Sequence, residues 1–141
     1  MDGDVFQPMW YNWIYDYPAV HLSAEETHNF YRDKIRKGLL RFPDLYIVFQ
    51  VEEKELRRRK DADKTRRRRN FEKHLQLIQP QLQYFKFLQQ HTDLAVEFMD
   101  YDDLNKTKRG VSLLIKQTNS KEKNDLQIFE KLCEWLDKNP I

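Results

Sequence analysis

The residues of this chain best suited to chemistry are the basic side chains of residues 57–69, called the basic segment here. The segment reads Arg-Arg-Arg-Lys-Asp-Ala-Asp-Lys-Thr-Arg-Arg-Arg-Arg, with nine Lys and Arg against two Asp. Its local charge is +7 in a chain whose formal net charge is +2, so the remaining residues sum to −5. Cations this close repel one another, and the planar guanidinium fork matches phosphate oxygens well. The basic segment therefore favours a phosphate-bearing partner over the alternative of a solvated helix end whose long side chains cover apolar surface.

Carboxylates at two other places could act beside these cations. Asp2 and Asp4 stand at the start of the sequence, and Asp100, Asp102 and Asp103 follow an apolar run. Carboxylate oxygens suit a hard divalent cation, but at the start of a helix they also cap free backbone N–H groups. For residues 100–103 we favour capping. The four histidines show no metal-ligand spacing, so no metal held by protein side chains is predicted.

The first elements that must position these groups are a helix and a strand. Ser23-Ala24-Glu25-Glu26 is a capping box and predicts a helix over residues 24–41, with Phe30, Tyr31, Ile35 and Leu39 inward. Residues 45–51 are a nearly continuous apolar run, which predicts a strand buried on both faces.

Further elements follow the basic segment. Phe71, Leu75, Ile78, Leu82, Phe85 and Leu88 share one helix face, and Pro80 should kink that helix. Residues 94–99 read as a second short strand. Two helices are expected to close the chain, separated near Asn119-Ser120. The first should bury Val111, Leu114 and Ile115. The second should bury Leu126, Phe129, Leu132, Cys133 and Leu136.

Alternation of buried strands with helices predicts an α/β fold with a parallel sheet. Only two strands are complete, with a strand remnant expected at residues 3–6, so the sheet should be short. We take residues 1–141 as one domain or part of one.

Composition limits the cellular setting. No apolar run approaches the ~20 residues of a membrane span, and Asp2 and Asp4 at the start do not fit a signal peptide. The single cysteine, Cys133, lies in a helical apolar pattern, which excludes a disulfide framework and favours a reducing compartment. We therefore expect a cytoplasmic protein with no membrane partner.

Several segments, taken in order, resemble the C-terminal portion of P-loop small-molecule kinases, especially the thymidylate kinase and deoxynucleoside kinase group. The resemblance covers roughly residues 2–118. The matching segments are Asp2-Gly3-Asp4, Phe42 to Val51, Glu55-Leu56 with the arginines that follow, Arg66 to Arg69 with Phe71 and Glu72, Tyr84-Phe85, and Val96 to Asp100.

This resemblance implies a three-layer, kinase-like fold that transfers the γ-phosphoryl group of ATP, with Mg²⁺, to a nucleoside, a nucleotide or another small metabolite. Residues 57–70 would be its lid. Arg57, Arg66, Arg68 and Arg69 would be the lid arginines over the donor phosphates. Asp2, Asp4, Trp10 and Tyr11 would lie on the acceptor side, and Asp100 and Asp102 beside the adenine.

The sequence departs from the family at its most important motif. A P-loop kinase needs G-x-x-x-x-G-K-[ST], whose backbone N–H groups and Lys cradle the donor phosphates. The glycines here, at 3, 38 and 110, form no such motif. The resemblance therefore implies a fold without its first β–P-loop–α unit, inactive as given. Apolar surface left by that unit should be covered by self-association or by a missing N-terminal segment.

A nucleic-acid-binding module is the alternative. Residues 57–69 would contact backbone phosphates, and the aromatic residues of 10–17 would stack on bases. The same aromatic residues could equally be core. The charge of −5 outside the basic segment counts against this alternative, because no second basic patch extends the footprint.

Overall fold

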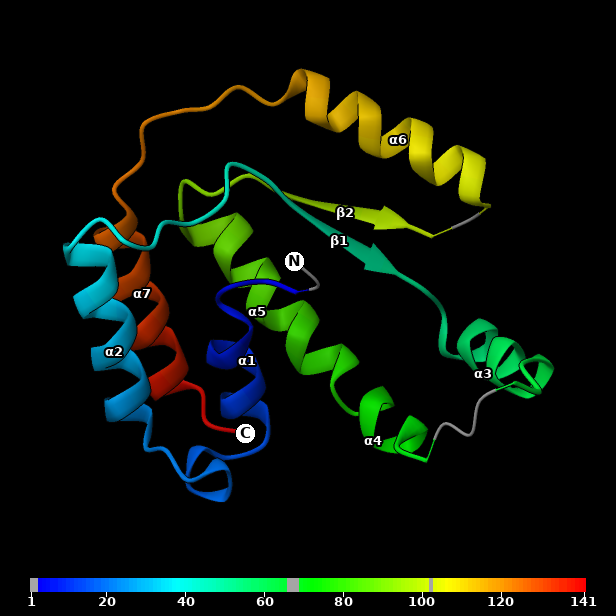
Figure 1. Ribbon diagram of the computed structural model, residues 1–141, viewed down its shortest axis with the longest axis horizontal. Coiled ribbons are helices and arrows are strands. Elements are labelled where there is room, and N and C mark those ends of the chain that lie inside the picture. Colours follow the sequence, from blue (N-terminus) through cyan, green and yellow to red (C-terminus); the bar gives the residue numbers. More distant parts are fainter. Residues whose placement is uncertain (1–2, 66–68, 102) are drawn as a thin grey trace.

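The structure describes residues 3–65, 69–101 and 103–141. In this computed structural model (Figure 1), the described elements are, in chain order, α1 (Gln7–Ile14), the 3₁₀ turn η1 (Tyr17–Val20), α2 (Ala24–Arg36), β1 (Tyr46–Gln50), α3 (Glu53–Ala62), α4 (Phe71–Leu75), α5 (Ile78–His91), β2 (Val96–Asp100), α6 (Leu104–Gln117) and α7 (Asp125–Lys138). Four of the candidate site residues, Asp2, Arg66, Arg68 and Asp102, lie outside the described residues.

The two strands form a parallel pair. Their register runs from Tyr46 opposite Val96 to Gln50 opposite Asp100, so both strands end at the same edge of the sheet. Helix α6 lies on one side of the sheet and α5 on the other (Figure 1). The prediction of a helix-rich α/β chain with a short parallel sheet is confirmed.

Strand β1 is buried on one face only, so the prediction of burial on both faces is wrong. Tyr46 and Val48 are each 9% exposed, and the Tyr46 ring packs on Phe85 of α5, whereas Phe49 is 46% exposed. On the opposite face α6 approaches β2, where Gly110 gives it room: a Cβ at Gly110 would lie 3.0 Å from Met99 Cε. Because a single helix covers a face of only two strands, the Phe49 side of β1 stays open.

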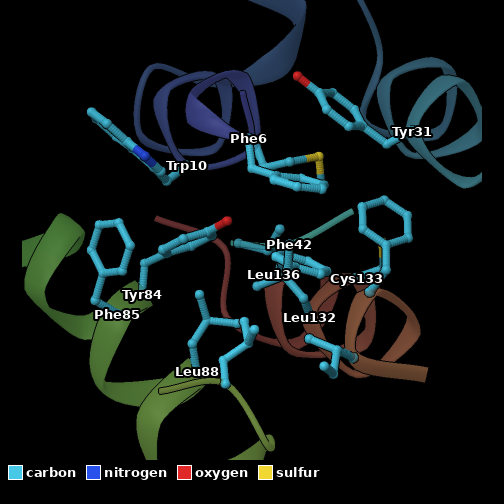
Figure 2. Packing of buried hydrophobic residues seen from close by; sticks show 14 of the residues in the cluster. Phe6, Trp10, Tyr31, Phe42, Tyr84, Phe85, Leu88, Leu132, Cys133 and Leu136 are labelled. Atoms are coloured by element: carbon cyan, nitrogen blue, oxygen red, sulfur yellow. The ribbon is translucent and has the colours of Figure 1, made fainter. Parts of the chain in front are cut away.

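The hydrophobic core lies below the sheet, where α1, α2, α5 and α7 converge. Figure 2 shows Phe6, Tyr84, Leu88 and Leu132 pointing into this space from segments far apart in sequence. Helix α7 packs against α2, so the last helix closes the core formed by the first ones. The predicted inward face of α7 is confirmed, with Leu126 only partly buried.

Helix α2 begins as predicted and ends earlier than predicted. Ser23 accepts a hydrogen bond from the Glu26 N–H, and the Glu26 carboxylate accepts one from the Ser23 N–H. The helix stops at Arg36 because Gly38 takes a positive φ of 69° and its N–H donates to the Ile35 carbonyl, a typical glycine C-cap. Leu39 therefore lies beyond the helix and is 66% exposed, against the prediction. Phe30, also expected inward, is 57% exposed because it lies off the buried face of α2, which carries Tyr31 and Ile35.

Residues 71–91 form two helices where one kinked helix was predicted. Pro80 is the third residue of α5 and lies in its first turn, where a missing backbone N–H costs nothing. The proline therefore starts a helix instead of bending one.

The inward face predicted for α6 is partly wrong. Val111 and Leu114 are half-buried, but Ile115 is 61% exposed. None of the helices in the described ranges combines the length and the apolar character needed to cross a membrane.

Candidate functional site

An open pocket lies at the carboxyl ends of the two parallel strands. Its volume is about 470 Å³, and it is lined by Gln50, Val51, Glu52, Glu55, Asp100 and Tyr101. These residues come from the end of β1, the start of α3 and the end of β2. In open α/β sheets, ligands bind outside the carboxyl ends of the strands. We call this place the strand-end pocket.

Tyr101 is the most firmly placed side chain at this pocket. Its backbone N–H donates to the Gln50 carbonyl at 3.0 Å, which extends the strand pairing by one residue. Its ring meets the Phe49 ring edge-on, at a centroid distance of 6.0 Å. The Arg59 guanidinium carbon lies 4.8 Å from the Tyr101 ring centroid, a distance typical of a cation–π contact. An aromatic surface with an adjacent cation therefore borders the pocket.

Glu55 connects the pocket to the basic side chains of α3. Its carboxylate accepts hydrogen bonds from Arg58 Nη2 at 2.7 Å and from Arg59 Nε at 2.8 Å. Hydrogen bonds from Arg58 and Arg59 lower the pKa of Glu55 to about 2. Glu55 is therefore ionised at neutral pH and holds both guanidiniums next to a carboxylate that lines the pocket.

The lining of the pocket is acidic. Glu52, Glu55 and Asp100 contribute carboxylates, and Asp100 is exposed. The described residues contain no group of three or more His, Cys, Asp or Glu arranged to hold a metal ion. The capping role expected for the acidic loop is confirmed at Asp103, whose carboxylate accepts from the Lys106 N–H at 2.9 Å.

The basic segment is not simply an unpaired connection between a strand and a helix, because residues 57–62 belong to α3. Arg57 donates two hydrogen bonds to the Glu72 carboxylate, at 2.6 and 3.0 Å, and one to Glu53 at 2.9 Å. These bonds raise the pKa of Arg57 and join α3 to α4 across the basic segment. Arg69 is exposed just before α4.

Asp4 lies at a different place from the strand-end pocket. Its Oδ1 accepts from the Tyr46 hydroxyl at 3.0 Å and from the Phe6 N–H at 3.1 Å. Burial raises the pKa of Asp4, and its Oδ2 is buried with no hydrogen-bond partner among the described residues. Together with Tyr46 and Ile47, Asp4 borders a cavity of about 390 Å³ beside β1.

The aromatic candidates are divided between core and surface. Trp10, Trp13 and Tyr17 are at most 8% exposed and belong to the core, so the structure places Trp10 away from solvent. Tyr11 is 37% exposed and packs against Tyr15, with ring centroids 4.7 Å apart. Of the two interpretations that the sequence left open for residues 10–17, the core holds for Trp10, Trp13 and Tyr17, and only Tyr11 and Tyr15 remain outside the set of buried residues.

Of the candidate site residues that the structure describes, only Asp100 lines the strand-end pocket. The structure adds Tyr101, Arg59 and Glu55, which sequence reasoning missed. One signal was present: Tyr101 lies two residues after the predicted strand of residues 94–99, and Glu55 and Arg59 are four residues apart on the helix that follows the other strand.

Comparisons with known proteins give no relative: no protein-family model, curated protein or solved structure matches this chain.

Proposed function

We propose that this chain binds a nucleotide, or another small molecule with a phosphate group, in the strand-end pocket, as part of a phosphoryl-transfer domain similar to the P-loop kinases. The observation that carries the proposal is the convergence of two parallel strand ends and an arginine-bearing helix on one pocket. Because the sequence has no G-x-x-x-x-G-K-[ST] motif, we propose ligand binding, and not turnover, as the activity of this chain.

Two features of the pocket fit two parts of a nucleotide. The Tyr101 ring borders the pocket with the Arg59 guanidinium over it, and an aromatic ring can stack on a planar base. Arg59 lies beside this ring, and both Arg58 and Arg59 are hydrogen-bonded to Glu55, which lines the pocket. Guanidiniums suit phosphate oxygens. The remaining cations of the basic segment, Arg69 among them, would extend this positive side as lid residues.

The carboxylates of the pocket limit the form in which a nucleotide can bind. Glu52, Glu55 and Asp100 would repel a bare polyphosphate. We therefore propose that the nucleotide is bound as its Mg²⁺ complex, with Asp100 on the side of the metal. Mg²⁺ usually takes only one or two protein carboxylates and completes its shell with phosphate oxygens and water. The absence of a three-residue metal cluster among the described residues is compatible with such a ligand.

The nucleic-acid alternative has less support. It needs exposed rings at residues 10–17, but three of the five are in the core. A cytoplasmic location remains our proposal, with the free, buried Cys133 as its support.

Calorimetric titration with Mg²⁺-ATP tests the proposal. Tyr101→Ala should weaken binding about tenfold, because stacking on an aromatic ring contributes ~1–3 kcal/mol. Arg59→Gln should weaken it as well, and tripolyphosphate should compete. Phe30→Ala is the control, since Phe30 is an exposed aromatic residue on α2, outside the pocket.

Duplex DNA provides the comparison that separates the two candidates. A nucleotide site engages few charges, whereas a nucleic-acid surface shows a salt slope of about −0.9 per phosphate contacted. If the protein binds DNA tightly with a steep slope and ignores Mg²⁺-ATP, the nucleotide proposal is wrong.

A further inference from the structure

The outer edge of β1 is open, while the outer edge of β2 is partly closed. In the parallel register, Tyr46, Val48 and Gln50 direct their backbone groups to β2, and the intervening Ile47 and Phe49 direct theirs outward. Within residues 3–65, 69–101 and 103–141, no backbone group pairs with Ile47 or Phe49. The corresponding edge of β2 is partly blocked, because its outward Val96 carbonyl already accepts a hydrogen bond from Gln89 Nε2 at 2.8 Å.

The sequence of β1 does not resemble that of a natural edge strand. Residues 45–51 contain no charged side chain, whereas β2 carries Glu97 and Asp100. Natural edges are usually protected by charges, by proline or by bulges, because unpaired strands pair with other chains. An isolated two-stranded sheet is also marginal by itself. We therefore expect the free edge of β1 to pair with another strand.

We propose that this edge is covered by β1 of a second copy of the chain. The two β1 strands run antiparallel about a two-fold axis at Val48, and the two sheets join into one sheet of four strands. In this register Ile47 of one copy lies opposite Phe49 of the other, which pairs every outward backbone group of both residues. It also forms two aromatic–β-branched cross-strand pairs, which stabilise antiparallel sheets.

The same register places Gln50 of the second copy opposite Tyr46, on the face of the sheet where Tyr46 bonds Asp4. The 390 Å³ cavity beside Tyr46 and Ile47 shows that the chain leaves space along this edge.

Because the β2 edge is partly blocked by Gln89, the pairing uses one edge per chain and closes as a dimer, not as a filament.

Sedimentation velocity over a range of protein concentrations tests the proposal. The wild-type chain should be a dimer. Phe49→Lys should be a monomer, because it places one lysine from each copy in the interface between the two β1 strands, where the two charges repel. Phe30→Lys is the matched control: Phe30 is 57% exposed, against 46% for Phe49, but lies on α2. It should remain a dimer.

Disulfide formation tests the register without relying on a charged variant. Val48→Cys should cross-link spontaneously, since facing residues of a non-hydrogen-bonded antiparallel pair lie ~4.5 Å apart between Cα atoms. Ile47→Cys should not, because in this register the Cα atoms of residue 47 in the two copies lie beyond the ~7 Å limit of a disulfide. Cys133 is buried and does not compete. A monomeric wild type, a dimer that survives Phe49→Lys, open-ended assembly, or a Val48→Cys variant that does not cross-link would each overturn the proposal.

Discussion

The hydrogen bond from Tyr46 to Asp4 can be tested by removing one hydroxyl. Tyr46→Phe keeps the ring that packs on Phe85 and removes the donor that lies 3.0 Å from Asp4 Oδ1. A hydrogen bond to a charged group contributes ~1.5–3 kcal/mol, and here its loss leaves a half-buried carboxylate with one donor, the Phe6 N–H. We expect the free energy of unfolding at neutral pH to fall by about 2 kcal/mol, from a total of ~5–15.

The loss should depend on pH in a defined direction. Burial raises the pKa of Asp4, and the Tyr46 hydrogen bond acts against this by favouring the ionised carboxylate. The stabilisation from Tyr46 is therefore present when Asp4 is ionised and shrinks as pH falls through the pKa of Asp4. Urea unfolding followed by tryptophan fluorescence, at neutral pH and below that pKa, measures both values.

Tyr84→Phe is the control for this measurement. Tyr84 is 0% exposed, and its hydroxyl has no hydrogen-bond partner among the described residues. Removing that hydroxyl should be neutral or slightly stabilising, because no partner is left unpaired. The reasoning about Asp4 is refuted if the two variants lose equal stability, or if the loss in Tyr46→Phe is the same at both pH values.

Three further predictions concern the core, a buried histidine and the basic segment. Phe129→Ala should lower the free energy of unfolding in urea by ~3–5 kcal/mol, because Phe129 is 0% exposed. Ile115→Ala, at a site 61% exposed, should change it by less than ~0.5 kcal/mol. Similar losses in the two variants would mean that the core is misplaced. Burial lowers the pKa of His28 below its ordinary 6.5, so the unfolded chain binds the proton more readily than the folded one, and stability should decline as pH falls through 6.5. His28→Gln should flatten this part of the stability–pH curve. An unchanged slope would contradict the prediction. Glu72→Gln removes the exposed Arg57 contact between α4 and α3, so it should lower the melting temperature at low salt and have no effect at high salt; a decrease that persists at high salt would rule out a screened surface pair.

Local signals in the sequence predicted local structure well. The capping box at Ser23 predicted the start of α2, and the apolar spacing of residues 126–136 predicted the buried face of α7. The first depends on contacts within one helical turn, and the second on a regular helical spacing of apolar residues. The two strands and their parallel direction also followed from the sequence, because apolar runs alternate with helical patterns.

Features that depend on distant contacts were not predictable. Phe49 belongs to an apolar run but is exposed, because the number of strands and helices around it cannot be read from the run itself. Pro80 interrupts an apolar period that suits one long helix, and only the structure shows that it begins α5. Tyr101 and Arg59 meet at the pocket because two strand ends meet, although the two residues are far apart in sequence.

The most direct test of the central claim is a ¹H–¹⁵N spectrum of the protein titrated with Mg²⁺-ATP. We predict that the shifted backbone amides cluster at Gln50, Glu52, Asp100 and Tyr101, which line the strand-end pocket, and that the shifts saturate. The amides of α7, on the far side of the core, should not move. Absence of saturable shifts, or shifts gathered outside the strand ends, would contradict the claim that this pocket binds a nucleotide.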